Sequence, residues 1–211
     1  MPSSDEGLVR IDAGGAMLEG NLLIPPGASG VVLFAHGSGS SRFSSRNRYV
    51  AEELRAGGLA TLLIDLLTPR EEPHLRFDID LLAQRLVDTI EWLSHDPATS
   101  RLRAGMFGAS TGGGAALVAA ARIPERVGAV VSRGGRPDLA GAALPKVKAP
   151  TLLIVGGDDL PVIGMNEEAY EQLTCTRRME IVPGASHLFE EPGTLERVAE
   201  LARGWFVQHL S

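Results

Sequence analysis

A serine between two glycines is the feature of this sequence best suited to carry chemistry. In the pattern Gly108-x-Ser110-x-Gly112 the serine follows a short apolar run and precedes an alanine-rich run. This order predicts a strand, a sharp turn and a helix, and glycine at both flanks lets neighbouring backbone approach where a Cβ would not fit. A serine held in such a turn exposes its hydroxyl, so Ser110 is a candidate nucleophile, but the motif alone fits a simple helix cap equally well and other segments must decide.

A nucleophilic serine needs a base within hydrogen-bond reach and a carboxylate that holds this base in the right tautomer. Two later segments offer these groups. The first, Gly156-Gly-Asp158-Asp159, directly follows an aliphatic run, and the second, Gly184-Ala-Ser-His187, follows the last apolar run. The order along the chain is therefore serine, acid, histidine, with Asp158 and Asp159 both open as the acid. Asp138, which follows the preceding apolar run, is a further, more distant alternative.

His187 is the best candidate for the base among the five histidines. His36 precedes the nucleophile, and we expect it to support a neighbouring loop through backbone hydrogen bonds. The other three are predicted in a polar loop, at a helix end and in the last helical turn, where they are poorly placed for a base: His74, His95 and His209.

Short aliphatic runs alternate with longer amphipathic stretches along most of the chain, which predicts parallel β-α-β units. In an open parallel sheet, the loops beyond the carboxyl ends of the strands converge and could bring the serine, acid and histidine together. The start of the chain instead predicts an antiparallel hairpin. The expected strands are Leu8–Ile11, Ala16–Ile24, Val31–Ala35, Ala60–Asp65, Ala104–Phe107, Ala129–Ser132, Thr151–Val155 and Arg178–Val182; the expected helices lie near Arg46–Ala56, Asp78–Leu93, after Ser110, and near Asn166–Leu173 and Leu195–Leu210.

These motifs resemble the α/β-hydrolase superfamily, and within it the small, lidless dienelactone-hydrolase-like group. The resemblance covers nearly the whole chain and rests on Phe34-Ala-His36-Gly37, Gly108–Gly112, Gly156–Asp159 and Gly184–His187, in that order. It implies a three-layer α/β sandwich with helices on both faces of a mostly parallel sheet. It also implies Ser110 as nucleophile, Asp159 as the acid of a G-x-x-D loop and His187 as general base. Dienelactone hydrolases use cysteine where this chain has Ser110, so a dienelactone substrate is not implied.

An acyl-transfer site also needs fixed donors for the oxyanion of the tetrahedral intermediate. We expect one from the backbone N–H of Thr111, directly after the nucleophile. Similarity to the family's His-Gly-x loop indicates the backbone N–H of Ser38 as the other. Arginines in loops near the top of the sheet are candidates for holding a carboxylate or phosphate of a substrate, and we single out Arg42 and Arg133 as pocket residues.

Composition restricts the class of protein. The chain has 211 residues, 44% hydrophobic and 22% charged, as expected for one globular domain over 1–211. A net charge of −6 gives no basic footprint for nucleic acid or anionic lipid. Cys175 is the only cysteine, which excludes an intrachain disulfide and a multi-cysteine zinc site. Acidic residues near the N-terminus and the lack of a long apolar run predict a cytoplasmic protein that neither carries a secretory signal nor crosses a membrane.

The sequence thus predicts a serine hydrolase that cleaves small soluble carboxylic esters through an acyl-enzyme on Ser110, without a metal or organic cofactor. Only residues 133–150 separate two predicted strands where many relatives insert a cap, so we expect no large cap and an open pocket. A lactonase or small peptidase with the same three groups is an alternative, and a catalytically silent binding domain is another. The expected partner is a small ester or lactone. The sequence leaves open whether the protein is a monomer or a dimer.

Overall fold

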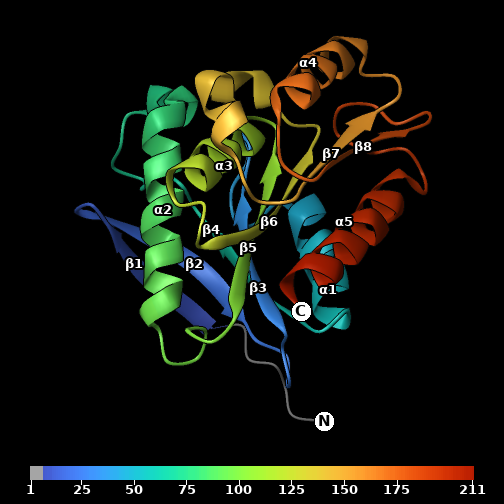
Figure 1. Ribbon diagram of the computed structural model, residues 1–211. Coiled ribbons are helices and arrows are strands. Elements are labelled where there is room, and N and C mark those ends of the chain that lie inside the picture. The colour runs from blue at the N-terminus through green and yellow to red at the C-terminus, as the bar shows by residue number, and fades with distance from the viewer. Residues whose placement is uncertain (1–6) are drawn as a thin grey trace.

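The computed structural model describes residues 7–211, which form one eight-stranded sheet covered by helices on both faces (Figure 1). The strand order is β1-β2-β4-β3-β5-β6-β7-β8. The strands from β4 to β8 along this order are parallel, whereas β1 and β2 form an antiparallel hairpin and β2 also pairs antiparallel with β4. The predicted α/β sandwich with an N-terminal hairpin is confirmed. The expectation of no secretory signal concerns mainly residues 1–6, which lie outside the described residues.

The hairpin and the parallel strands follow the apolar runs of the sequence. All six residues of each of the strands β3, β4 and β7 are buried, because these strands lie inside the sheet with helices on both sides. The strands are β1 (Gly7–Ala13), β2 (Ala16–Leu23), β3 (Gly30–Ala35), β4 (Leu59–Ile64), β5 (Arg103–Ala109), β6 (Val127–Arg133), β7 (Thr151–Gly156) and β8 (Arg177–Val182).

Successive strand residues point to opposite faces of the sheet and therefore contribute side chains to two hydrophobic cores. Val31 and Leu33 join the core that packs against α2, α3 and α4, whereas Val32 and Phe34 join the core under α1 and α5. In Figure 1, α1 and α5 lie together on one side of the sheet, and α2 and α3 lie on the other. The helices are α1 (Ser45–Ala56), α2 (Ile79–His95), α3 (Thr111–Arg122), α4 (Leu160–Gln172) and α5 (Thr194–Leu210).

Two segments differ from the predicted elements. Helix α4 begins at Leu160, six residues before the predicted start, because Pro161 occupies the first turn, where a missing N–H and a fixed φ are favourable. The stretch expected to be irregular between β6 and β7 contains a 3-10 segment, η2 (Pro137–Lys146), with a kink at Gly141. A short 3-10 segment, η1 (Pro73–Phe77), also precedes α2. No cap domain is inserted between β6 and β7, as expected.

No helix within residues 7–211 is both long enough and apolar enough to cross a membrane.

Candidate functional site

Ser110 lies in a strained turn between the carboxyl end of β5 and the start of α3. Its backbone has φ +52° and ψ −123°, a conformation that costs a residue with a side chain about 1–3 kcal/mol. The turn is held from both sides: the Ser110 N–H donates to the carbonyl of Arg133 at 3.3 Å, and its own carbonyl accepts from the N–H of Arg136 at 3.0 Å. The fold thus maintains a conformation that presents the serine side chain outside the strand.

The two glycines of the motif are required by close backbone approach. A Cβ on Gly108 would come within 2.5 Å of the carbonyl oxygen of Gly112. A Cβ on Gly112 would come within 2.2 Å of the carbonyl oxygen of Ala35, in the neighbouring strand. Both distances are below any real Cβ contact, so the Gly-x-Ser-x-Gly pattern reflects the steric demands of this turn.

Asp159 and His187 are joined by a hydrogen bond of 2.7 Å between Oδ2 and Nδ1. The pair forms although 28 positions separate its members, because β7 and β8 are parallel neighbours and the loops after them lie side by side. Two backbone bonds tie these loops together: the N–H of Gly157 donates to Val182 at 2.8 Å, and the N–H of Asp158 donates to Ala185 at 3.0 Å. Asp158 itself is exposed. Of the two adjacent acids, the structure therefore brings Asp159 to the histidine.

The histidine loop has its own support. The carboxylate of Glu191 accepts a hydrogen bond from the N–H of Ser186 at 3.0 Å, and the hydrogen bonds from Ser186 lower the pKa of the Glu191 carboxyl. Phe189 is fully buried with a positive φ of 56° and anchors the segment just after His187. The imidazole is held between a buried anchor and the acid loop, while more than a third of its side chain remains exposed.

Ser110 and His187 line one cavity of about 240 Å³. Asp159 reaches this cavity only through His187. The cavity wall also includes Gly37 and Ser38 of the loop after β3, and the residues Arg46, Asn47 and Arg133. Thr111 is the first residue of α3, so its N–H has no acceptor within the helix and lies at the positive end of the helix dipole. Of the two expected donors, Ser38 therefore lies on the cavity wall in the loop after β3, and Thr111 directly follows the nucleophile at the start of α3.

His36 supports the loop that carries Ser38. The N–H of Leu66 donates to Nε2 of His36 at 3.1 Å, so Nε2 is unprotonated and Nδ1 donates to the carbonyl of Gly37 at 2.8 Å. Burial lowers the pKa of His36, which keeps the ring neutral as both bonds require. The expected backbone role of His36 is confirmed.

Two residues that sequence reasoning missed hold Leu66 in turn. Arg85, which is buried on α2, donates to the carbonyl of Leu66 and forms an ion pair with Glu71. This pairing lowers the pKa of Glu71 from 4.5 to about 2. The only signal in the sequence is that Arg85 lies three residues after Leu82, within the apolar stripe of its helix, where a charged side chain needs a partner.

Of the two expected pocket residues, Arg42 and Arg133, only one lies at the cavity. Arg133 lines the cavity at Ser110. Arg42 does not: its guanidinium donates to Glu19 at 2.9 Å, to Asn21 at 3.0 Å and to Asp65, at the β2–β4 side of the sheet. The expectation for Arg42 is corrected, because two carboxylates that are distant in sequence bind it. Asp138, the more distant alternative acid, is bound by Arg136 at 2.7 Å.

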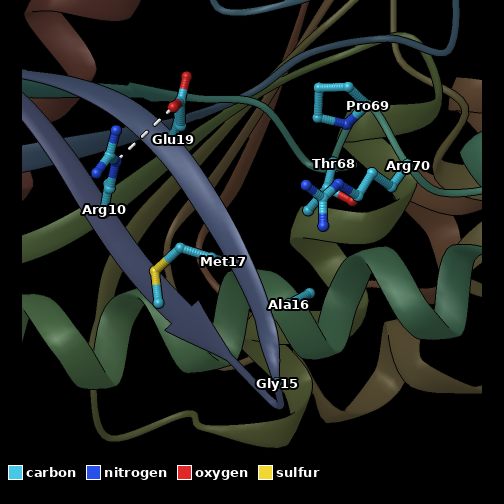
Figure 2. A pocket seen from close by; sticks show the side chains of 8 residues that line it. All are labelled: Arg10, Gly15, Ala16, Met17, Glu19, Thr68, Pro69 and Arg70. Carbon is cyan, nitrogen blue, oxygen red and sulfur yellow. Dashed lines mark ion pairs between the residues drawn. The ribbon is translucent and has the colours of Figure 1, made fainter.

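A larger groove lies away from these groups, between the β1–β2 hairpin and the loop around Thr68 (Figure 2). Its volume is about 510 Å³, and its wall includes Arg10, Met17 and Arg70. Figure 2 shows the ion pair between Arg10 and Glu19 at its margin. Its eight lining residues include the hydroxyl of Thr68 but no histidine to act as its base, so the groove lacks the paired groups seen at Ser110. The smaller cavity at Ser110 is the candidate active site.

Comparison with known proteins gives a consistent family. The model of the Dienelactone hydrolase family matches residues 23–205. A crystal structure of dienelactone hydrolase from Anabaena variabilis is 66% identical in sequence, with a TM-score of 0.96 over 98% of this chain and 99% of that chain. Est1E from Butyrivibrio proteoclasticus has a TM-score of 0.82 over 96% of this chain and 98% of its own, at 17% identity, which shows a shared fold.

Two proteins of Mycobacterium tuberculosis are similar over most of this chain but are much longer. Each is 58% identical over 204 residues, which is 96% of this chain and 46% of the relative, and each bears the name "Putative phosphoribosyl transferase". The chain therefore spans about half the length of these curated relatives.

Proposed function

The chain belongs to the dienelactone hydrolase family, and on this premise we propose that it is a hydrolase, namely a serine carboxylesterase for small esters. One observation carries the proposal: the same cavity is bordered by Ser110, which lies in a strained turn, and by His187, which is hydrogen-bonded to Asp159. A nucleophile, a base and an orienting acid on three separate loops are the groups that acyl transfer requires.

The hydrogen bond to Asp159 decides which nitrogen of His187 acts as the base. Nδ1 donates its proton to the carboxylate, so Nε2 carries the lone pair that accepts the Ser110 hydroxyl proton. The Ser110 oxygen then forms a bond to the ester carbonyl carbon, and the carbonyl electron pair moves onto its oxygen. The backbone N–H groups of Thr111 and Ser38 donate to this oxyanion. Asp159 meanwhile stabilises the imidazolium that forms.

Collapse of the intermediate breaks the bond to the alcohol, which leaves with the proton from His187 Nε2. The acyl group remains on Ser110. His187 next takes a proton from water, whose oxygen attacks the acyl carbon, and the second collapse returns the proton to Ser110 and frees the acid. The open cavity of about 240 Å³ and the lack of a cap between β6 and β7 favour small soluble esters. A lactone would follow the same steps, except that its alcohol group stays attached to the acyl group after the ring opens.

The phosphoribosyl transferase name of the M. tuberculosis relatives is not carried over. It belongs to proteins of which this chain spans 46%, and a strained serine with a His–Asp pair is suited to acyl transfer.

Hydrolysis of p-nitrophenyl acetate by matched variants tests the proposal. Ser110→Ala and His187→Ala each lower kcat/KM by about 10³-fold or more, because each removes a group that acts in the transition state. Ser100→Ala and His95→Ala are the controls, since both residues are exposed near the opposite end of β5, and their activities stay at the wild-type level. A loss of only twofold in the folded Ser110→Ala variant contradicts the assignment.

A further inference from the structure

The segment that carries Ser38, residues 36–44 between β3 and α1, has no regular secondary structure, and we call it the Ser38 loop. Gly39 and Ser40, the two residues after Ser38, are exposed. A donor to an oxyanion is effective when its position is fixed before the reaction begins. The position of the Ser38 N–H must therefore be set by contacts between this loop and other segments.

The Ser38 loop lies directly against the nucleophile. A Cβ on Gly37 would come within 3.1 Å of the Cβ of Ser110 and within 3.3 Å of the carbonyl oxygen of Ala109. Because Gly37 precedes Ser38, a displacement of the loop moves the Ser38 N–H relative to Ser110. A misplacement of about 1 Å at a reacting centre can lower the rate by about 10²-fold.

On both sides of Ser38, the loop is bound to two consecutive residues that follow β4. On the first side, Nε2 of His36 accepts a hydrogen bond from the N–H of Leu66 at 3.1 Å. On the second side, the carboxylate of Asp65 accepts the backbone N–H of Arg42 at 2.7 Å and a further hydrogen bond from the Arg42 guanidinium. Because Asp65 and Leu66 are neighbours, one short segment fixes the loop before and after Ser38.

The side chain of Arg42 extends this attachment to β2. Its Nε donates to the amide oxygen of Asn21 at 3.0 Å, its Nη2 donates to Glu19 at 2.9 Å, and its Nη1 binds Asp65, so each guanidinium nitrogen has an acceptor. Only 13% of the Arg42 side chain is exposed, against 68% for Arg10, which also pairs with Glu19. A shielded arginine with several charge-assisted hydrogen bonds holds its partners more firmly than a surface pair does.

The segment after β4 is itself held in place. The N–H of Asp65 donates to the carbonyl of Glu19 at 3.0 Å, which continues the pairing of β4 with β2. The carbonyl of Leu66 accepts a hydrogen bond from Arg85 of α2. Leu66 is thus bound through its N–H and its carbonyl, and the Ser38 loop rests on a segment that the sheet and α2 both fix.

We propose that Arg42 and Asp65 are positioning residues, whose ion pair holds the Ser38 loop so that the Ser38 N–H lies where the oxyanion forms. The inference rests on the proposed esterase function and on Ser38 as a donor. Neither side chain lines the cavity at Ser110, so both act through the loop. Donors to an oxyanion stabilise the transition state more than the bound ester. Loss of the pair therefore weakens transition-state binding and leaves ground-state binding unchanged.

Two inhibitors of similar shape separate these two kinds of binding. With trifluoroacetophenone, the Ser110 oxygen adds to the activated carbonyl carbon, the serine proton passes to His187, and the carbonyl electron pair becomes an oxyanion. Acetophenone has an unactivated carbonyl and binds without this bond. In Arg42→Gln, the Ki of trifluoroacetophenone rises by about tenfold or more, whereas the Ki of acetophenone stays within about twofold. The kcat/KM for p-nitrophenyl acetate falls by the factor by which the Ki of trifluoroacetophenone rises.

A double variant tests whether the two residues act through one contact. Asp65→Ala removes the acceptor of both the backbone N–H and the guanidinium of Arg42, so its loss of kcat/KM is at least as large as that of Arg42→Gln. The double variant loses no more than Asp65→Ala alone, because the contact is already gone. Losses that multiply in the double variant overturn the proposal, since they indicate independent effects.

Arg126→Gln is the matched control. Arg126 directly precedes β6, at the opposite end of the sheet, and pairs with Glu91 of α2 at 2.9 Å. The substitution removes an ion pair between two segments, as Arg42→Gln does, but at a distance from the Ser38 loop. Its kcat/KM and both Ki values therefore stay at the wild-type level.

The outcomes distinguish this inference from the esterase proposal. In folded Arg42→Gln, equal rises of the two Ki values indicate a general distortion of the cavity and overturn the inference, and so does an unchanged Ki of trifluoroacetophenone. If Arg42→Gln does not fold, Arg42→Lys, which keeps the charge but not the three-nitrogen contact, gives the same comparison with a severalfold rise. Hydrolysis by the wild type leaves the esterase proposal intact in each case. A folded wild type that neither hydrolyses the ester nor binds trifluoroacetophenone overturns both.

Discussion

At the residue scale, the candidate site depends on how tightly the backbone packs around Ser110. The serine has a positive φ, and the glycines beside it lie against other backbone segments. The pattern Gly108-x-Ser110-x-Gly112 could be recognised in the sequence because glycine is the residue that such approaches need. The choice between Asp158 and Asp159 depended on resemblance, since only the folded loops show which carboxylate faces His187.

Substitution of Gly112 by alanine tests the packing. The new Cβ would lie 2.2 Å from the Ala35 carbonyl oxygen, so backbone must shift and the turn at Ser110 is displaced. We expect the free energy of unfolding to fall by about 1–3 kcal/mol, as in other overpacked sites, and esterase activity to be lost. Gly164→Ala is the control. Nothing lies within 4 Å of its Cβ and it is helical, so it stabilises α4 by about 0.5–1 kcal/mol. Denaturant unfolding of both variants measures the contrast.

The two neighbouring acids differ in their expected effects on catalysis. Asp159→Asn removes the charge that orients His187 and lowers kcat by about 10³-fold or more. Asp158→Asn changes an exposed side chain and leaves kcat within a factor of two to three. Steady-state kinetics of the two variants on one ester make the comparison. A larger loss for Asp158→Asn would refute the assignment of the acid.

At the element scale, four loops meet at the carboxyl end of the sheet. The loops after β3, β5, β7 and β8 carry Ser38, Ser110, Asp159 and His187, respectively. Their convergence follows from the alternation of apolar runs and helices, which predicts parallel strands. The prediction that Arg42 lines the pocket was wrong because its partners come from β2 and from the end of β4. The residues near Arg42 in the sequence do not indicate this pairing across the antiparallel part of the sheet.

Helix α2 contributes to the site from a distance. Through Arg85 it holds Glu71 and Leu66, and Leu66 in turn orients His36 under the loop of Ser38. The helix itself was predicted from its apolar stripe. The buried arginine was missed because a pattern of apolar spacing does not reveal which polar side chain turns inward.

The Glu71–Arg85 pair makes a pH-dependent contribution to stability. Arg85 lowers the pKa of Glu71 from 4.5 to about 2, so the native state binds a proton less readily than the unfolded state. The stabilisation is fully present above pH 4.5 and is lost as the pH falls towards 2. We therefore expect Glu71→Gln to be less stable than the wild type at pH 7 and the difference to shrink between pH 4.5 and 2. Urea unfolding at several pH values measures it. A difference independent of pH would show that the charge of Glu71 is not involved.

At the scale of the whole molecule, an acidic chain surrounds a cationic cavity. The net charge is −6, whereas the wall beside Ser110 holds two arginines, of which only Arg46 has a carboxylate partner, the exposed Glu190. The net charge predicts no overall basic footprint, but it could not reveal that the cavity wall beside Ser110 is locally positive. The family match over residues 23–205 includes all four loops of the candidate site. The site therefore belongs to the part of the chain shared with the family.

Covalent labelling of Ser110 tests the central claim most directly. Folded wild-type protein is treated with a fluorophosphonate probe, and intact mass and peptide mapping locate the adduct. The account predicts one probe per chain, on Ser110, with no labelling of Ser110→Ala and much slower labelling of His187→Ala, which lacks the base that activates the serine. Folded wild-type protein that stays unlabelled, or that carries the adduct on another residue, would contradict it.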